Sequence, residues 1–215
     1  MESIWNDWEE HYGKIGICSS RICKDGIVQP DKYKNEGLKI LFVGKEVNDW
    51  PGGDMRSLAK EGPKYSYLHN LARWAAGLLD QFPDFLKINN RESLNAALRR
   101  VALINLKKTS GGSAANMTRI AAYAKNDKEL LRKQIELIKP NVIVPLATHD
   151  ILIWLLDLEV DPDSPNSFPY YSNKNKAWIV PWKHPSMRGE VEATYNQMRD
   201  FINKEESFYH IRKTN

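Results

Sequence analysis

The chain has 215 residues, of which 42% are hydrophobic and 27% charged, and Lys and Arg outnumber Asp and Glu by 31 to 27, which fits an ordinary soluble protein and identifies no special class. The longest apolar run, Ile151 to Leu156, is too short to span a bilayer, and the acidic N-terminus lacks the apolar region of a secretory signal. We therefore expect one cytoplasmic domain over residues 1–215, with an N-terminal extension at 1–37, a core at 38–202 and a tail at 203–215.

Apolar spacing and turn residues define the expected secondary structure. Short β-rich apolar runs predict strands, and apolar residues three and four positions apart predict helices. In chain order the expected elements are a helix at 3–12, a strand at 38–43, helices at 65–80 and 91–100, a strand at 101–104, a helix at 127–139, a strand at 142–144, a helix at 148–156, a strand at 177–180 and a helix at 190–203. Segments 13–37, 45–64 and 161–175 are interrupted by Gly, Pro, Asn or Asp and predict loops.

The order of these elements predicts the fold class. Strands that alternate with helices of ten or more residues are typical of a parallel sheet with helices on both faces. We therefore expect a mixed α/β protein, a three-layer α/β/α sandwich around a central four-stranded parallel sheet.

Three of the expected strands end beside a polar side chain suited to chemistry. Glu46 follows the strand that breaks at Gly44, Asn105 ends the second strand, and His184 follows the last one. Open α/β sheets bind ligands in the crevice outside the carboxyl ends of their strands, so these side chains are candidates for one site. Each has a structural alternative: Glu46 as a helix cap, Asn105 as a partner of loop backbone groups, and His184 as a core residue that fixes a turn.

These residues, in this order, resemble the uracil-DNA glycosylase superfamily over roughly residues 38–202. The sequence Gly-Lys-Glu-Val at 44–47 resembles the family's first motif, a strand followed by Gly-x-Asp/Asn-Pro. The sequence His-Pro-Ser-Met-Arg at 184–188 resembles its second motif, His-Pro-Ser followed by an apolar wedge. Asn105 stands where the family has a base-reading Asn at the end of its second strand.

The resemblance implies a uracil-DNA glycosylase-like fold and a monofunctional DNA glycosylase. Such an enzyme flips a damaged or modified pyrimidine out of DNA and hydrolyses its N-glycosidic bond, which leaves an abasic site. Glu46 would orient or activate water and stabilise the oxocarbenium-like sugar, and His184 would donate to the oxyanion that develops on the departing base. This chemistry requires no cofactor and no metal, and we expect a monomer whose partner is DNA.

The resemblance also indicates the contact residues. The expected base-binding residues are Asn105, Asn48, Trp50, Tyr65 and Tyr67, and the expected DNA-binding residues are Lys107, Lys108, Ser110, Ser113, Ser186, Met187 and Arg188. Residues 99–139 hold ten basic side chains against three acidic ones, which favours a polyanion near that surface. The alternatives are aromatic rings that pack as core or rim, and basic side chains that only solvate helix faces.

The chain departs from the family at three places. Thr109 stands where several relatives have an iron–sulfur ligand, so we expect no cluster and two reduced, structural cysteines. The family usually has Leu where this chain has Arg188, so either Met187 or Arg188 is the expected wedge. Strictly uracil-specific members have Pro-Tyr where this chain has Val47 and Asn48, and that Tyr excludes substituents at pyrimidine C5.

The third departure leaves two substrate classes open. One is uracil or another deaminated base, in repair. The other is a 5-substituted cytosine of phage DNA, such as hydroxymethylcytosine or its glucosylated form, in antiviral defence, for which the loop at 161–175 would supply sugar contacts. The alternatives from other classes are a non-catalytic nucleic-acid-binding protein and a hydrolase of free modified nucleotides.

Overall fold

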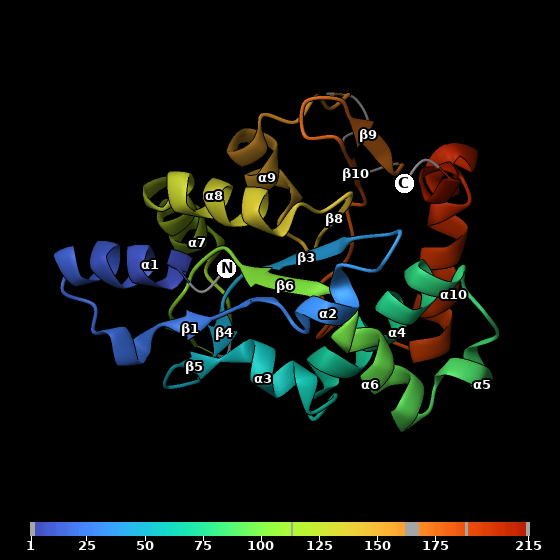
Figure 1. Cartoon of the computed structure of the whole chain (residues 1–215), viewed down its shortest axis with the longest axis horizontal. Coiled ribbons are helices and arrows are strands. Elements are labelled where there is room, and N and C mark those ends of the chain that lie inside the picture. The colour runs from blue at the N-terminus through green and yellow to red at the C-terminus, as the bar shows by residue number, and fades with distance from the viewer. Residues whose placement is uncertain (1–2, 113, 162–167, 188, 214–215) are drawn as a thin grey trace.

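The computed structural model describes residues 3–112, 114–161, 168–187 and 189–213, and it has a central sheet with helices on both sides (Figure 1). The helices are α1 (Ser3–Lys14), α2 (Pro30–Tyr33), α3 (Met55–Lys60), α4 (Ser66–Asp80), α5 (Phe85–Ile88), α6 (Arg91–Arg99), α7 (Met117–Asn126), α8 (Lys128–Ile138), α9 (His149–Leu156) and α10 (Val191–Ile202), with 3-10 helices η1 (Ser19–Arg21) and η2 (Glu206–Lys213). The strands are β1 (Cys23–Lys24), β2 (Gly26–Ile27), β3 (Ile40–Gly44), β4 (Val47–Asn48), β5 (Gly53–Asp54), β6 (Ala102–Asn105), β7 (Ser110–Gly111), β8 (Val142–Pro145), β9 (Tyr170–Ser172) and β10 (Ala177–Ile179).

The central sheet has six strands in the order β2-β6-β3-β8-β10-β9. Its four middle strands are parallel and are the four that the sequence predicts, whereas the edge strands β2 and β9 are antiparallel to their neighbours. A sheet of only four strands was therefore an incomplete prediction. The edge strands have two and three residues, too few to show an alternating pattern.

Alternate residues of β3 enter two separate cores. Ile40 and Phe42 pack with α4, α6 and α10, and Leu41 and Val43 pack on the other side of the sheet with α1, α7, α8 and α9. All five residues of β3 are buried, as expected for a parallel strand covered on both faces. The chain is thus a mixed α/β protein with a six-stranded, mostly parallel sheet flanked by helices.

The helices that the sequence predicts are confirmed, with ends that differ by one or two residues. The Asn90 side chain accepts a hydrogen bond from Ser93 N (3.0 Å) at the start of α6, as an N-cap does. Four α-helices were not predicted. The short helices α2 and α3 lie within the expected loops at 13–37 and 45–64, α5 has only four residues, and α7 buries only Ile120 and Ala124 and so has a weak apolar pattern.

The N-terminal segment is part of the fold rather than an extension added to it. Trp5, Trp8 and Tyr12 on α1 are buried in the core beneath that helix, and β2 is one edge of the sheet. The two tryptophans therefore share the buried face of α1. In the tail, Phe208 is also buried, where it packs against the Trp178 ring at 5.4 Å between centroids.

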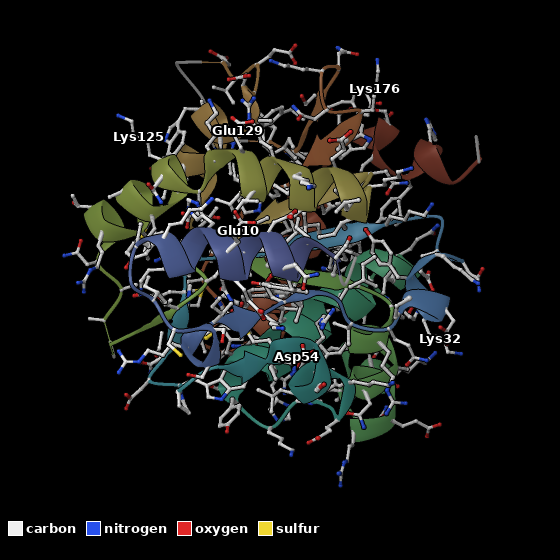
Figure 2. All side chains as sticks on the ribbon, turned by 60° about the vertical axis from the view of Figure 1, so that its left-hand side comes forward. Glu10, Lys32, Asp54, Lys125, Glu129 and Lys176 are labelled. Carbon is white, nitrogen blue, oxygen red and sulfur yellow. The ribbon has the colours of Figure 1, made fainter. Side chains whose placement is uncertain are left out.

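Charged side chains cover the outer faces of the helices. Figure 2 shows Glu10 on α1 and Glu129 on the neighbouring α8, both on the outside of the molecule. Within the described residues, every helix is too short or too polar to cross a membrane.

Candidate functional site

The carboxyl ends of β3 and β6 bring two of the predicted residues together. Gly44 lies opposite Asn105 in the parallel register, and Leu106 N donates to Gly44 O at 3.0 Å. Beyond the sheet, β4 and β7 continue the pairing, with Val47 opposite Ser110. The segments at 44–48 and 105–111 therefore run side by side away from the sheet edge.

Gly44 has no room for a side chain because two polar atoms lie over it. A Cβ at this position would be 2.6 Å from Asn105 Oδ1 and 3.1 Å from the Tyr67 hydroxyl. Asn105 is buried, and its amide nitrogen donates to the Met55 sulfur at 3.1 Å. The amide that the sequence predicts as a base reader thus faces Gly44 with its oxygen and α3 with its nitrogen.

Tyr67 connects this pair to the third predicted residue. It lies near the start of α4, and its ring is 5.8 Å from the His184 ring between centroids. Burial raises the pKa of the Tyr67 hydroxyl, which therefore stays protonated. Asn105, Tyr67 and His184 come from three separate segments and meet at one edge of the sheet.

The loop that carries His184 is fixed from two sides. Trp182 N donates to Pro145 O at 2.9 Å, which ties the loop to β8, and the Asn70 side chain donates to Pro185 O at 2.7 Å. Ser186 N donates to His184 Nδ1 at 3.2 Å, so Nδ1 is an acceptor and a neutral ring carries its proton on Nε2. Burial, with the positive charge of Lys45, lowers the pKa of His184 to about 4.

Glu46 is held by a cation that the sequence assigned to DNA. Lys107 Nζ lies 2.5 Å from Glu46 Oε2, and it also donates to Ser110 O at 2.7 Å. The Lys107 and Glu46 side chains are 3% and 7% exposed. A Cβ on Gly111 would lie 2.0 Å from the Glu46 carboxyl carbon, so that glycine leaves space for the carboxylate. Among the described residues, no group donates a hydrogen bond to Oε1.

Lys108 lies in the core and not on a surface that DNA can reach. Its side chain is fully buried, and its ammonium is 2.8 and 2.9 Å from the two carboxylate oxygens of Asp25. The Trp8 ring lies beneath the same ammonium at 5.2 Å from its centroid. The predicted phosphate contact of Lys108 is therefore wrong, because the side chain is buried. The predicted phosphate contact of Lys107 does not agree with the structure either, because its ammonium is bound to Glu46.

Asp25 also lies at this edge, although no pattern in the sequence singles it out. Its carboxylate also accepts from Asn105 N at 2.8 Å and from the Gln134 side chain at 2.9 Å. Burial raises the pKa of Asp25, and the nearby charge of Lys108 opposes this shift. Asp25 therefore fixes both the backbone of Asn105 and the side chain of Lys108.

The remaining predicted contacts lie around the rim or outside the described residues. Asn48, Tyr65, Ser186 and Met187 are exposed, while Trp50 is half-buried and its backbone N–H donates to the Ser110 hydroxyl at 2.8 Å. Ser113, Arg188 and positions 162–167 of the expected sugar-binding loop lie outside the described residues.

Two cavities lie elsewhere in the described part of the molecule. One of about 530 Å³ lies at the amino ends of the strands, and one of about 310 Å³ lies between α4 and α6. Neither is lined by Glu46, Asn105 or His184, so neither is the predicted base pocket. In the described ranges, no group of three His, Cys, Asp or Glu side chains is placed to hold a metal ion, and Cys18 and Cys23 are both free thiols.

The arrangement offers a neutral imidazole donor, a buried amide and an ion-paired carboxylate at one sheet edge. The chain matches no protein-family model and no curated protein sequence at a significant level. The resemblance to uracil-DNA glycosylases therefore depends on the residues and their placement alone.

Proposed function

We propose that this protein is a monofunctional DNA glycosylase with a uracil-DNA glycosylase-like site at the carboxyl edge of its sheet. The observation that carries the proposal is the meeting of Asn105 and Tyr67 over Gly44, a glycine that admits no side chain, with the His184 ring beside Tyr67. Such a cluster, two residues from Glu46, suits a reaction that separates a cationic sugar from an anionic base.

In this proposal each polar group has a separate task. Asn105 reads the flipped base, and the Nε2–H of His184 donates to the base oxygen as negative charge develops there. Glu46 stabilises the sugar cation and holds water through Oε1, the oxygen that Lys107 does not bind. The lysine holds the carboxylate in place, although its charge also weakens the attraction of Glu46 for the sugar cation.

Two substrate classes follow from the first motif. Asn48 is exposed where uracil-specific relatives have a Tyr that closes the C5 side of the pocket. The proposal therefore includes 5-substituted cytosines, such as hydroxymethylcytosine and its glucosylated form, together with uracil. Excision of 5-substituted cytosines would serve defence against phage with modified DNA, and excision of uracil would serve repair.

A panel of matched oligonucleotides tests the proposal. Single-stranded and duplex DNA would contain uracil, a thymine mismatch, hydroxymethylcytosine or glucosylated hydroxymethylcytosine, with alkali cleavage of abasic sites as the readout. We expect Glu46→Gln to lower kcat at least 100-fold with a much smaller effect on KM, because the charge acts mainly in the transition state. Free nucleoside monophosphates are the control for a nucleotide hydrolase. Absence of product from every base would contradict the proposal.

A glycine pair tests whether the position of the Glu46 carboxylate matters. In Gly111→Ala the new methyl group displaces the carboxylate, and we expect kcat to fall about 10- to 100-fold, since small misplacements of catalytic groups are costly. Gly112→Ala is the matched control, because a Cβ there meets no atom within 4 Å. Equal activity of the two variants would remove Glu46 from the mechanism.

The ion pair of Glu46 favours one alternative function. A carboxylate that is neutralised by Lys107 also suits a non-catalytic protein that keeps the site only to bind nucleic acid. In that case Glu46→Gln and His184→Ala would leave salt-dependent DNA binding unchanged, and no base would be released from any member of the panel.

A further inference from the structure

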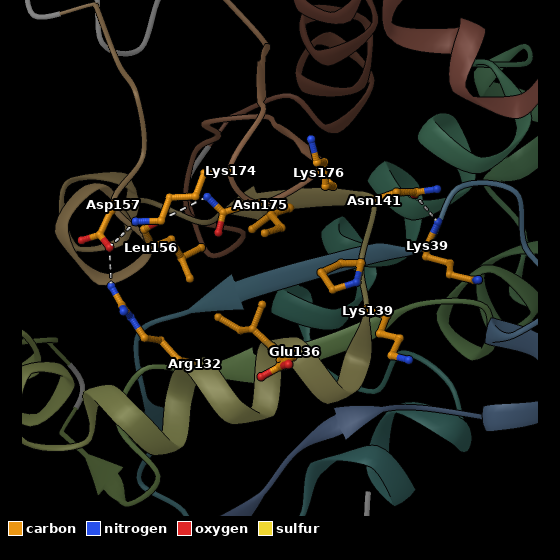
Figure 3. A pocket seen from close by; sticks show the side chains of 13 residues that line it. Lys39, Arg132, Glu136, Lys139, Asn141, Leu156, Asp157, Lys174, Asn175 and Lys176 are labelled. Atoms are coloured by element: carbon orange, nitrogen blue, oxygen red, sulfur yellow. Dashed lines mark hydrogen bonds and ion pairs between the residues drawn. The ribbon is translucent and has the colours of Figure 1, made fainter. Parts of the chain in front are cut away.

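The cavity of about 530 Å³ lies at the amino edge of the sheet, the end opposite to Glu46 and His184 (Figure 3). Lys39 precedes β3, Asn141 precedes β8 and Lys176 precedes β10, and all three line it. These strands are neighbours in the sheet, and adjacent strands are about 4.8 Å apart. Residues from three separate segments therefore meet within roughly 10 Å at this edge.

The lining of this cavity is rich in positive charge. Its basic residues are Lys39, Arg132, Lys139, Lys174 and Lys176, and its acidic residues are Glu136 and Asp157. At one end, Asp157 binds Arg132 at 2.8 Å and Lys174 at 2.7 Å, as Figure 3 shows. Within the described residues, Lys39, Lys139 and Lys176 form no ion pair, so three positive charges remain uncompensated around the opening.

Two of these lysines occupy backbone conformations that disfavour lysine. Lys139 ends α8 at φ 52° and ψ 54°, and Lys176 has φ 51° before β10. Glycine adopts this left-handed region without steric cost and is the usual residue at a helix end of this kind. Of the seven non-glycine residues with positive φ in the described ranges, three line this one cavity: Lys139, Asp157 and Lys176. Local rules of this sort are typically broken where a side chain has a function.

The floor of the cavity is apolar. Ile135, Ile143 and Leu156 line it and are 7%, 1% and 6% exposed. A volume of about 530 Å³ is within the range of small-molecule sites, which combine apolar walls with a few polar groups. Inorganic phosphate would use the lysines and leave this floor empty, whereas a nucleotide has both a flat apolar base and phosphates.

We infer that this cavity binds a nucleoside polyphosphate, with the base on the apolar floor and the phosphates at Lys39, Lys139 and Lys176. In Figure 3 the side chains of Lys39, Lys139 and Lys176 point in different directions, and the flexible four-carbon stem of lysine lets their ammonium groups turn over the opening. The uncompensated lysines, Lys39, Lys139 and Lys176, cover only a short length of surface, because Glu136 and the ion pairs of Asp157 lie beside them. Such a short positive surface suits one compact polyphosphate rather than the long row of phosphates of duplex DNA.

Isothermal titration of the full chain with ATP, GTP, CTP, UTP and tripolyphosphate tests the inference. We expect at least one nucleoside triphosphate to bind with a micromolar Kd, at least 10-fold more tightly than tripolyphosphate, because only the nucleotide uses the apolar floor. No binding of any triphosphate at 1 mM, or equal binding of tripolyphosphate, would contradict the inference. This result does not depend on whether the protein is a glycosylase.

The double variant Lys139→Gly with Lys176→Gly makes the test specific. Glycine removes both cations and also fits both backbone positions, so we expect nucleotide binding at least 10-fold weaker in a protein that unfolds at the same or a higher denaturant concentration. Lys32→Gln with Lys125→Gln is the charge-matched control, since these lysines lie on α2 and α7 away from Lys176 (Figure 2) and line no part of the cavity. An unchanged Kd in the glycine variant, or an equal loss of duplex DNA binding, would overturn the proposed ligand class.

Discussion

Lys107 and Lys108 are adjacent in the chain, and each binds a carboxylate, but the two ion pairs lie in different regions. Lys108 and Asp25 are fully buried under α1, whereas Lys107 and Glu46 lie at the sheet edge with 3% and 7% of their side chains exposed. The chain bends at these residues, and one lysine enters the core while its neighbour enters the candidate site. Two identical residues in one motif therefore have different physical roles.

The surroundings of the two pairs explain this difference. Asp25 accepts hydrogen bonds from Lys108, Asn105 N and Gln134, so both charges of the core pair are compensated without water. At the sheet edge, one oxygen of Glu46 has no donor among the described residues. The core pair is thus complete as a structural element, whereas the edge pair leaves a carboxylate oxygen available to a ligand.

Removal of Asp25 has the largest expected effect. Asp25→Ala leaves the Lys108 ammonium buried and unpaired, and we expect the free energy of unfolding to fall by about 3 to 5 kcal/mol. Urea denaturation at pH 7 measures this loss. Asp25→Leu combined with Lys108→Met removes both charges and is expected to recover most of the stability, and a loss below about 1 kcal/mol in Asp25→Ala would contradict a structural role.

Removal of Lys107 has a smaller expected effect on stability. Lys107→Met keeps the apolar stem and leaves Glu46 without its partner. Because Glu46 lies at the edge, water can reach it once the ammonium is gone, so we expect the free energy of unfolding to fall by about 1 to 3 kcal/mol. If the proposed function holds, kcat also falls about 10-fold with little change in KM, because the lysine places the carboxylate. Equal stability losses in Lys107→Met and Asp25→Ala would mean that the two pairs have the same role.

The third prediction concerns pH and His184. The unfolded chain protonates this ring as the pH falls through about 6.5, but the folded chain does so only near pH 4 because burial lowers the pKa. The stability that the neutral ring contributes is thus complete above pH 6.5 and declines toward pH 4. Between pH 7 and 4.5 we expect the free energy of unfolding to fall by roughly 1 kcal/mol, a value that already allows for the partial solvent exposure of the ring. This fall should be absent from His184→Gln. Parallel pH profiles of the two proteins would contradict the shift.

The sequence predicts the four parallel strands and six of the helices because each of these elements has a recognisable apolar pattern. It also predicts which polar residues follow the strand ends, because carboxyl ends of parallel strands meet at one edge. The ion-pair partners of Glu46 and Lys108 were not predictable from the sequence. Lys107 is 61 residues from Glu46, and Asp25 is 83 residues from Lys108 in a segment without a regular pattern. Nor does the sequence distinguish Lys107 from Lys108 without the direction of each side chain.

The two edges of the sheet have a consequence for self-association. β2 contributes two residues and β9 three, and both run antiparallel to the strands they cover. Edges this short offer few open N–H and C=O groups to a strand from another molecule. The protein is thereby protected against edge-to-edge aggregation, and contacts with other macromolecules are left to its side chains.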